Sequence, residues 1–462
     1  MNHTESLTHF CHATYHEQLP NDVQEMTKKL LLDCIGVTLR SSEKQASTSI
    51  LKTALSLSSK GDSTVFGTTY SLPSQYAALV NGTTAHGIEL DDVTSESSLH
   101  PGVVVIPVAL AVAEEQNNTP DQVIRSIVAG YEMMMRLGEA ITNPSGNYER
   151  GFHPTGICGV FGATMAAGCL LGLKKEEMLH AIGIAGSMAS GSMEYLSNGA
   201  WTKKLHAGWA AHNGIIAAKS AANGFVGPAT IFEGTFGFFK AYASIHDANK
   251  LHENRRAPYK IIETNIKLHA CCRYMHAQMD AAKHLYEEHD FHPDDIIAID
   301  TTVLTGGEAL VAVPLEAKQT PDNVVDAQFS LPYGIAVVLT YGKGGYHEFD
   351  ESIIHAPSIK RLMKTVRISK QEKYDSLYPK KWGASVQITL KDGRILKKEI
   401  NHPQGGWPGS VATWESITTK FLDLTDGIVE KQAQIALIES IKSFDSAKSG
   451  LNLREILLST TV

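Results

Sequence analysis

The sequence predicts a mainly α-helical protein that has a large helical domain and a smaller α/β domain inserted before the C-terminal helices. In the first half of the chain, apolar segments of helical length follow one another between Gly, Pro and Asn residues. From about residue 267 helical and β-rich segments alternate, and after residue 402 helical segments return. We therefore expect a helical domain over residues 1–266 and 403–462 and an α/β domain over residues 267–402.

The helices expected in the first domain share an apolar stretch bounded by helix-breaking residues. They cover residues 23–39, 73–90, 105–115, 120–141, 156–171, 176–186 and 207–223. The fourth has the clearest start, because Thr119 is a good N-cap, Pro120 suits the first helical position and Asp121 lies in the first turn. Residues 155–173 carry no charge and are roughly of bilayer length, but their five glycines favour a buried core helix, and we expect no membrane span.

The second domain is expected to mix strands with helices. Helices are predicted over residues 276–288 and 327–341, and β-rich segments over residues 296–304 and 365–369. Residues 384–400 form two alternating runs around Asp392-Gly393, which is the strongest hairpin signal in the chain. Further helices are expected over residues 413–422, 428–440 and 453–458.

Composition excludes several classes of protein. With 43% apolar and 19% charged residues, a chain of 462 residues can bury large cores. Its net charge of −8 comes with no basic stripe, so nucleic acid is not an expected partner. The six cysteines include no C-x-x-C pair, which argues against a disulfide framework and an iron–sulfur cluster. The polar N-terminus lacks a signal-peptide pattern, so we expect a cytoplasmic protein.

Four segments are the best candidates for a catalytic cleft. Residues 86–102, 150–156, 201–212 and 267–276 each place histidine, lysine or carboxylate beside Gly or Pro in apolar surroundings. Glycine and proline give the backbone special geometry, so that neighbouring polar groups can point into a pocket. The chain contains no G-x-G-x-x-G fingerprint after a strand, no Walker loop and no zincin helix, so no cofactor is expected.

Two kinds of chemistry are open for the first of these segments. His86, Asp91, Asp92 and His100 are a possible set of metal ligands, because imidazole and carboxylate suit several divalent ions. Alternatively, Glu89 or Asp92 faces a pocket and His100 transfers protons without metal, or the two aspartates only cap neighbouring backbone. We expect no bound metal.

Lysines accompany histidine in the third and fourth segments. Of Lys203 and Lys204, which precede His206, one facing inward would clamp a substrate carboxylate. Lys267 precedes an apolar, thiol-rich run, where a solvated lysine is less expected, and the alternative is that its charged end reaches the surface while its stem lies along apolar groups. A pair of inward lysines would suit a di- or tricarboxylate.

Six motifs in this order and spacing resemble the MmgE/PrpD family over nearly the whole chain. They are NGTTAHGIELDD, RGFHPTGICGVFGA, WTKKLHAGWAAHNG, GPATIFEGTFGFFKAY, KLHACCRYMHAQMDAA and AQFSLPYGIA. The family includes 2-methylcitrate dehydratase, cis-aconitate decarboxylase and iminodisuccinate epimerase, which are cofactor-free enzymes that work beside carboxylates. The resemblance implies a homodimer whose subunit has a large helical domain and a smaller α/β lid.

The resemblance also implies which residues form the site. The catalytic positions are Asp92, His100, His153, Lys203, Lys267 and Tyr333. Substrate-binding positions are His86, Glu89, Lys204, His206, Cys272 and His276. The chain departs from the decarboxylase-like pattern at Glu89, which replaces an aspartate, at Val93, which replaces a threonine, and near Cys272, where the pattern has a histidine. The loop before His100 is also one residue longer.

In the family chemistry, lysines neutralise carboxylates, His100 or His153 exchanges protons, and Tyr333 donates to the leaving group. We therefore expect a lyase that dehydrates or decarboxylates a small polycarboxylate, with a 2-methylcitrate-like acid slightly preferred. One alternative is an epimerase or isomerase of a substituted succinate. The other is a non-catalytic polycarboxylate-binding protein, which the substitutions at Glu89 and Val93 keep open.

Overall fold

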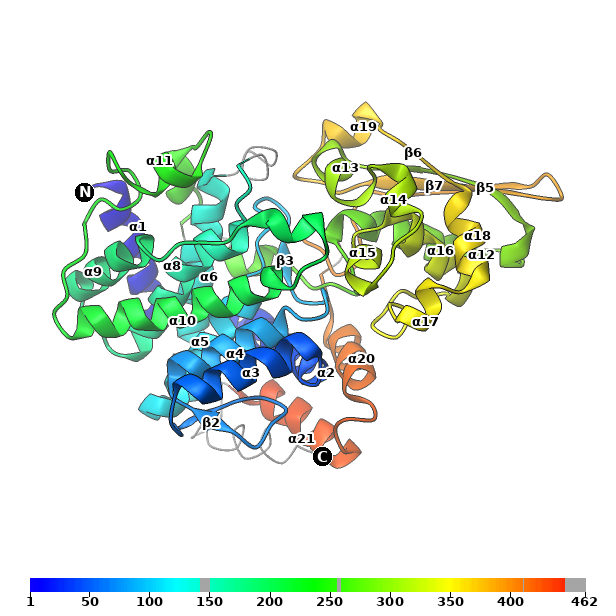
Figure 1. Cartoon of the computed structure of the whole chain (residues 1–462). Coiled ribbons are helices and arrows are strands. Elements are labelled where there is room, and N and C mark those ends of the chain that lie inside the picture. The colour runs from blue at the N-terminus through cyan, green and yellow to red at the C-terminus, as the bar shows by residue number, and fades with distance from the viewer. Residues whose placement is uncertain (142–149, 256–258, 410, 445–462) are drawn as a thin grey trace. The chain divides into compact units, whose positions relative to one another are not determined.

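The computed structural model describes residues 1–141, 150–255, 259–409 and 411–444, and it is mainly α-helical (Figure 1). The contacts divide the chain into two compact units. Unit 1 comprises Met1–Gly87, Asp91–Thr264 and Thr413–Val462, and unit 2 comprises Ile88–Leu90 and Asn265–Ala412.

Unit 1 is built almost entirely from helices. Its α-helices are α1 (His3–His16), α2 (Asn21–Ser41), α3 (Gln45–Leu57), α4 (Ser74–Ala85), α5 (Gly102–Gln116), α6 (Pro120–Ile141), α8 (Pro154–Leu170), α9 (Lys175–Gly186), α10 (Thr202–Ala222), α11 (Phe238–Tyr242), α20 (Trp414–Thr425) and α21 (Lys431–Lys442). It also has the 3-10 helices η1 (Met193–Ser197), η2 (Ala248–Leu251) and η3 (Lys260–Glu263), and the short strands β1 (Ser63–Thr64), β2 (Ser71–Leu72) and β3 (Val93–Thr94).

The core of unit 1 surrounds α8, which packs against α6 and α10. Every residue of α8 is buried, as expected for a helix that is apolar on all sides. Glycines let neighbouring helices approach closely: a Cβ at Gly208 of α10 would lie 2.1 Å from the Leu79 carbonyl oxygen of α4. This close packing fixes the ends of α4, α8 and α10, which carry the candidate site.

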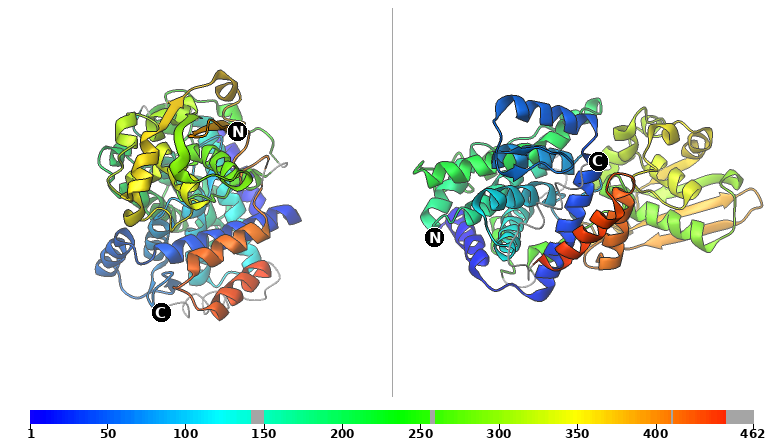
Figure 2. Two further views of the ribbon diagram at one scale, coloured as in Figure 1. Left: turned by 90° about the vertical axis from the view of Figure 1, so that its right-hand side faces the viewer. Right: turned by 90° about the horizontal axis from the view of Figure 1, so that it is seen from below.

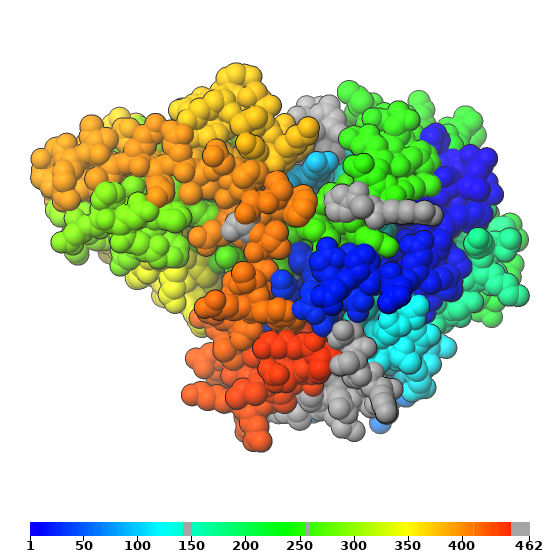
Figure 3. All heavy atoms as spheres, turned by 180° about the vertical axis from the view of Figure 1, so that it is seen from behind, coloured from blue at the N-terminus to red at the C-terminus, as the bar shows by residue number. Residues whose placement is uncertain are grey.

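The C-terminal helices return to unit 1. Helix α2 lies alongside α20 and also contacts α21 (Figure 2). The space-filling view shows the N-terminal helices beside these C-terminal helices on the surface (Figure 3). Gly36 of α2 makes room for Phe421 of α20, since a Cβ there would lie 2.9 Å from the phenylalanine ring.

Unit 2 combines a four-stranded sheet with helices. The strands β5 (Ile296–Thr302), β6 (Val366–Ser369), β7 (Ala384–Leu390) and β8 (Ile395–Ile400) have the order β6-β5-β7-β8, in which only the β5–β6 pair is parallel. The helices are α12 (His276–Glu288), α13 (Thr305–Val311), α14 (Leu315–Lys318), α15 (Val324–Gln328), α16 (Leu331–Tyr341), α17 (Glu351–Ile354), α18 (Pro357–Lys364) and α19 (Glu372–Asp375), with 3-10 turns η4 (Arg273–Met275) and η5 (Pro293–Asp295). Helix α12 packs on β7 and β8, and α16 contacts both α12 and α18. The strand β4 (Thr264–Asn265) spans the boundary between the units.

Several predicted elements are confirmed. Helix α6 has the predicted bounds, and Thr119 caps it: its hydroxyl accepts from the Gln122 N–H at 3.3 Å, and its own N–H donates to the Gln122 side chain at 2.8 Å. Helix α12 also has the predicted bounds. Strands β7 and β8 form the predicted hairpin, with Gly393 at φ 87° in its turn.

Other predicted bounds are wrong. Helix α4 ends at Ala85 instead of residue 90, because the chain turns away and Glu89 adopts a left-handed backbone with φ 56°. Helix α10 begins at Thr202 instead of residue 207, so its lysines lie on the helix. The predicted helix over 327–341 is interrupted, because Ser330 caps a new helix by accepting from the Tyr333 N–H.

The structure also contains helices for which the sequence analysis made no prediction. Helices α1 and α3 were not predicted from the sequence. The helix expected over residues 453–458 lies outside the described residues.

Among the helices of the described ranges, none combines the length and apolarity that crossing a bilayer requires.

Candidate functional site

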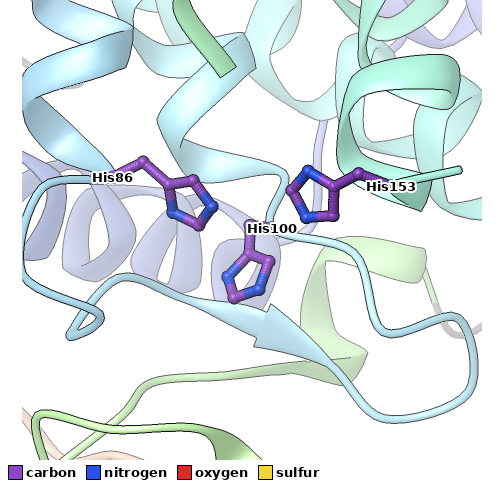
Figure 4. A group of neighbouring side chains, drawn as sticks. All are labelled: His86, His100 and His153. Atoms are coloured by element: carbon purple, nitrogen blue, oxygen red, sulfur yellow. The ribbon is translucent and has the colours of Figure 1, made fainter. Parts of the chain in front are cut away.

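Three histidines of unit 1 lie close together at the ends of helices. His86 follows α4, His100 precedes the Pro101 cap of α5, and His153 is the N-cap of α8. One ring nitrogen of each lies within 4.8 Å of those of the other two, and Figure 4 shows the three rings side by side. Their side chains are buried, with 0%, 7% and 3% exposure.

Asp91 connects two of these histidines. Its Oδ2 lies 3.0 Å from Nδ1 of His86 and 2.7 Å from Nδ1 of His100. A carboxylate accepts hydrogen bonds, so this geometry favours the tautomer in which each Nδ1 carries the proton. The Nε2 of each ring then carries the lone pair, and the buried Nε2 of His86 has no hydrogen-bond partner among the described residues.

A fourth histidine extends the group. Nδ1 of His206, on α10, lies 3.1 Å from Nδ1 of His153. Burial, followed by the charges of His206 and Lys203, lowers the pKa of His153 well below its ordinary value. Burial, with smaller contributions from His86 and Lys203, lowers the pKa of His206 to about 4. Both imidazoles are therefore neutral at pH 7 and able to accept a proton.

A cavity of about 600 Å³ lies beside His206. Its lining residues all come from the segment 190–209, among them Ser192, Tyr195, Asn198, Thr202 and His206. One wall is attached to the start of α8, because the His153 N–H donates to the Gly191 carbonyl at 2.8 Å. The volume suits a small-molecule ligand, and His206 connects the cavity to His153.

The structure distinguishes the two lysines at the start of α10. Lys203 is buried, with 8% exposure, whereas Lys204 is partly exposed. The charge of Lys203 contributes to the lowered pKa values of His153 and His206. Lys203 is therefore the lysine placed to act on a bound anion in this region.

Asp92 has a different environment from Asp91. Its carboxylate accepts from the Gly102 N–H at the start of α5 at 2.9 Å and from the Tyr131 hydroxyl at 2.8 Å. Burial raises the pKa of Asp92 to about 7, although the hydrogen bond from Tyr131 opposes this shift. Of the possible metal-ligand set His86, Asp91, Asp92 and His100, His86 and His100 belong to the group whose ligand atoms converge, and His153 is its third member.

Unit 2 contains the other predicted site residues, and two of them form an ion pair. Nζ of Lys267 lies 3.2 Å from Oε2 of Glu89 and also donates to the Glu89 carbonyl at 3.2 Å. Lys267 is 1% exposed and Glu89 4% exposed. Gln328, which sequence reasoning missed, donates to the Ile88 carbonyl at 3.0 Å and holds this short segment.

The remaining predicted residues of unit 2 are also buried and have partners. Cys272 donates its N–H to the Gln328 carbonyl. His276 lies 3.2 Å from the Arg273 guanidinium, and burial followed by the Arg273 charge lowers its pKa well below the ordinary value. The Tyr333 hydroxyl donates to the Glu348 carbonyl at 2.5 Å, and burial raises the pKa of Tyr333.

Comparison with known proteins supports the family resemblance. The family model for the MmgE/PrpD N-terminal domain matches residues 5–250, and the model for the MmgE/PrpD C-terminal domain matches residues 269–444. The chain is 27% identical to a cis-aconitate decarboxylase of Aspergillus terreus, with 87% of this chain and 85% of the relative covered. It is 26% identical to the cis-aconitate decarboxylases of Mus musculus, with coverages of 90% and 86%, and of Homo sapiens, with coverages of 96% and 92%.

Proposed function

Because the chain belongs to the MmgE/PrpD family, we propose that the protein is a lyase that acts on a small di- or tricarboxylate by proton transfer next to a carboxylate. No cofactor takes part in the proposed reaction. The observation that carries the proposal is the pair His153 and His206, whose pKa values are lowered beside Lys203, next to a cavity of ligand size. The names of the curated relatives favour decarboxylation over dehydration as the first reaction to test.

The proposed mechanism gives the histidines the proton transfers. His153 or His100 removes or supplies the proton: the lowered pKa of His153 leaves its imidazole lone pair available at neutral pH, and His100 is oriented by the Asp91 carboxylate. Lys203 and Lys267 neutralise substrate carboxylates and the charge of the enolate-like intermediate, and fixed charges act strongly in a site shielded from water.

The other predicted residues support these steps in the proposal. Asp92 is assigned to the catalytic group, and Tyr333 donates to the leaving group. Substrate binding is assigned to six residues: His86, Glu89, Lys204, His206, Cys272 and His276. For Glu89 and Tyr333 the proposal requires that the substrate replace the contacts with Lys267 and the Glu348 carbonyl.

The first experiment is NMR of the purified protein in D₂O with citrate, 2-methylcitrate, cis-aconitate and substituted succinates. Loss of CO₂ or water with formation of an alkene product establishes the lyase and identifies the leaving group. Deuterium incorporation without net product identifies an epimerase or isomerase instead. Binding of a polycarboxylate without any turnover contradicts the lyase and supports the binding protein. His153→Gln serves as the negative control for turnover.

We also propose that the protein is a cytoplasmic homodimer, as the family resemblance implies. Large apolar side chains support a partner surface on unit 1, since Phe225 is 65% exposed and Phe236 96% exposed. Light scattering should give twice the mass of one chain, and a monomer would contradict the proposed assembly.

A further inference from the structure

We propose that His86, His100 and His153 together bind one divalent transition-metal ion of the zinc type. The three side chains come from separate segments, yet one ring nitrogen of each lies within 4.8 Å of those of the others (Figure 4). All three are buried, so an ion bound there would be shielded from competing water.

One of the three histidines has a ring nitrogen that no hydrogen bond from the described residues satisfies. A metal ion binds an imidazole through the lone pair of one ring nitrogen. The buried Nε2 of His86 has no hydrogen-bond partner among the described residues, and a buried polar atom without a partner is costly. Coordination to a metal ion would satisfy this nitrogen.

Asp91 supplies the second requirement of a histidine metal site. Metal-binding histidines usually donate their other N–H to a carboxylate or carbonyl, which fixes the ring and strengthens its lone pair. Asp91 Oδ2 lies 3.0 Å from Nδ1 of His86 and 2.7 Å from Nδ1 of His100. One carboxylate thus orients two of the three ligands, and its negative charge favours a cation, whereas the charge of Lys203 opposes one.

The donor set selects the kind of ion. Imidazole nitrogens suit zinc, cobalt, nickel and copper, whereas magnesium and calcium prefer oxygen. In a tetrahedral site with zinc–nitrogen bonds of ~2.0–2.1 Å, the ligand nitrogens lie roughly 3.4 Å apart. Binding must therefore draw the rings together. Three imidazoles leave a fourth position open for water or a carboxylate.

The ion would inhibit the proposed reaction, and this consequence alone rests on the proposed function. Metal coordination occupies the same imidazole lone pairs that His100 and His153 need for proton transfer. The protein should therefore lose activity in proportion to the amount of zinc bound, and chelator treatment should leave activity intact or raise it.

The test measures metal binding directly. Chelator-treated protein is titrated with Zn²⁺ against a competing indicator, and Co²⁺ binding is followed by visible absorption. We expect one ion per chain, tetrahedral cobalt bands, and no competition by Mg²⁺. His86→Gln should weaken zinc binding at least 10-fold, and Asp91→Asn should weaken it by about 10–100-fold.

The matched control is His12→Gln. His12 is also buried in unit 1, but its Nε2 contacts the Leu173 carbonyl at 2.9 Å and it is not part of the cluster. This variant should bind zinc with unchanged affinity. Absence of stoichiometric zinc binding by the unaltered protein, or equal binding by all three variants, overturns the proposal. If His86→Gln does not fold, the cobalt spectrum of the unaltered protein and the zinc titration of Asp91→Asn decide whether the three histidines bind metal.

The outcomes separate this site from the proposed function. Stoichiometric zinc binding without turnover of any polycarboxylate supports the metal site and contradicts the lyase. Turnover without zinc binding supports the lyase and contradicts the metal site. Turnover that increases with bound zinc overturns the inhibitory role.

Discussion

The two units hold buried polar groups in opposite ways. In unit 1, His86 and His100 share the single carboxylate of Asp91, and burial lowers the pKa of the neighbouring His153 and so favours its neutral ring. In unit 2, Lys267 and Glu89 form a buried ion pair at 3.2 Å. An imidazole can lose its charge near neutral pH, whereas lysine and glutamate are buried as ions only when they are paired. The first arrangement suits proton transfer and the second suits fixed charge.

The largest loss of stability is expected when the ion pair between Lys267 and Glu89 is broken. Lys267→Met leaves the Glu89 carboxylate buried without its lysine, so the free energy of unfolding should fall by about 3–5 kcal/mol. Urea unfolding measures this change. The double variant Lys267→Met/Glu89→Gln should recover most of the lost stability but none of the activity. Equal stability of the single and double variants would show that the pair is not the cause.

Substitution of His153 should affect the catalytic rate more than the stability of the fold. His153→Gln removes the proposed proton carrier and should lower kcat by ~10²–10⁴-fold, while circular dichroism shows a folded protein. Because the change affects the proton-transfer step, KM should change less than kcat. An unaltered kcat would remove His153 from the mechanism and leave His100 as the candidate.

The pH dependence of stability tests the charge state of buried histidine in unit 2. Burial and then Arg273 lower the pKa of folded His276 well below the value of about 6.5 expected in the unfolded chain. Between these two pKa values the unfolded state binds more protons, so stability falls as the pH drops below about 6.5.

His276→Gln should remove this contribution. The slope of unfolding free energy against pH should decrease by up to ~1.4 kcal/mol per pH unit, the equivalent of one proton. Urea unfolding between pH 7 and pH 5 gives the slope for both proteins. If the two slopes agree, His276 is not held neutral in the folded state.

The smallest effect is expected from a control variant that lies outside the histidine group of unit 1 and the ion pair of unit 2. Thr119→Ala removes the N-cap of α6 and should lower stability by about 0.5–2 kcal/mol. Neither kcat nor zinc binding should change, since Thr119 is not among the site residues. A loss of activity as large as that of His153→Gln would mean that activity simply follows stability.

Local sequence was sufficient to predict the start of α6 and the turn of the β7–β8 hairpin. The α6 helix begins at Pro120 because Thr119 and Gln122 cap each other, and the hairpin turns at Asp392-Gly393 because glycine adopts positive φ there. The histidine-bearing segments could likewise be found from residue type and neighbouring Gly or Pro. These features depend on residues that are close in the chain.

Tertiary packing alone decided the roles of neighbouring identical residues. Asp92 contacts Tyr131, which lies in the middle of α6 and gives no sequence signal, whereas Asp91 contacts His86 and His100. Both lysines lie on the first turn of α10, where successive side chains point in different directions, and Lys203 is buried whereas Lys204 is partly exposed. The sequence determined which residue types were available, but partners from distant segments decided which carboxylate binds histidine and which lysine faces inward.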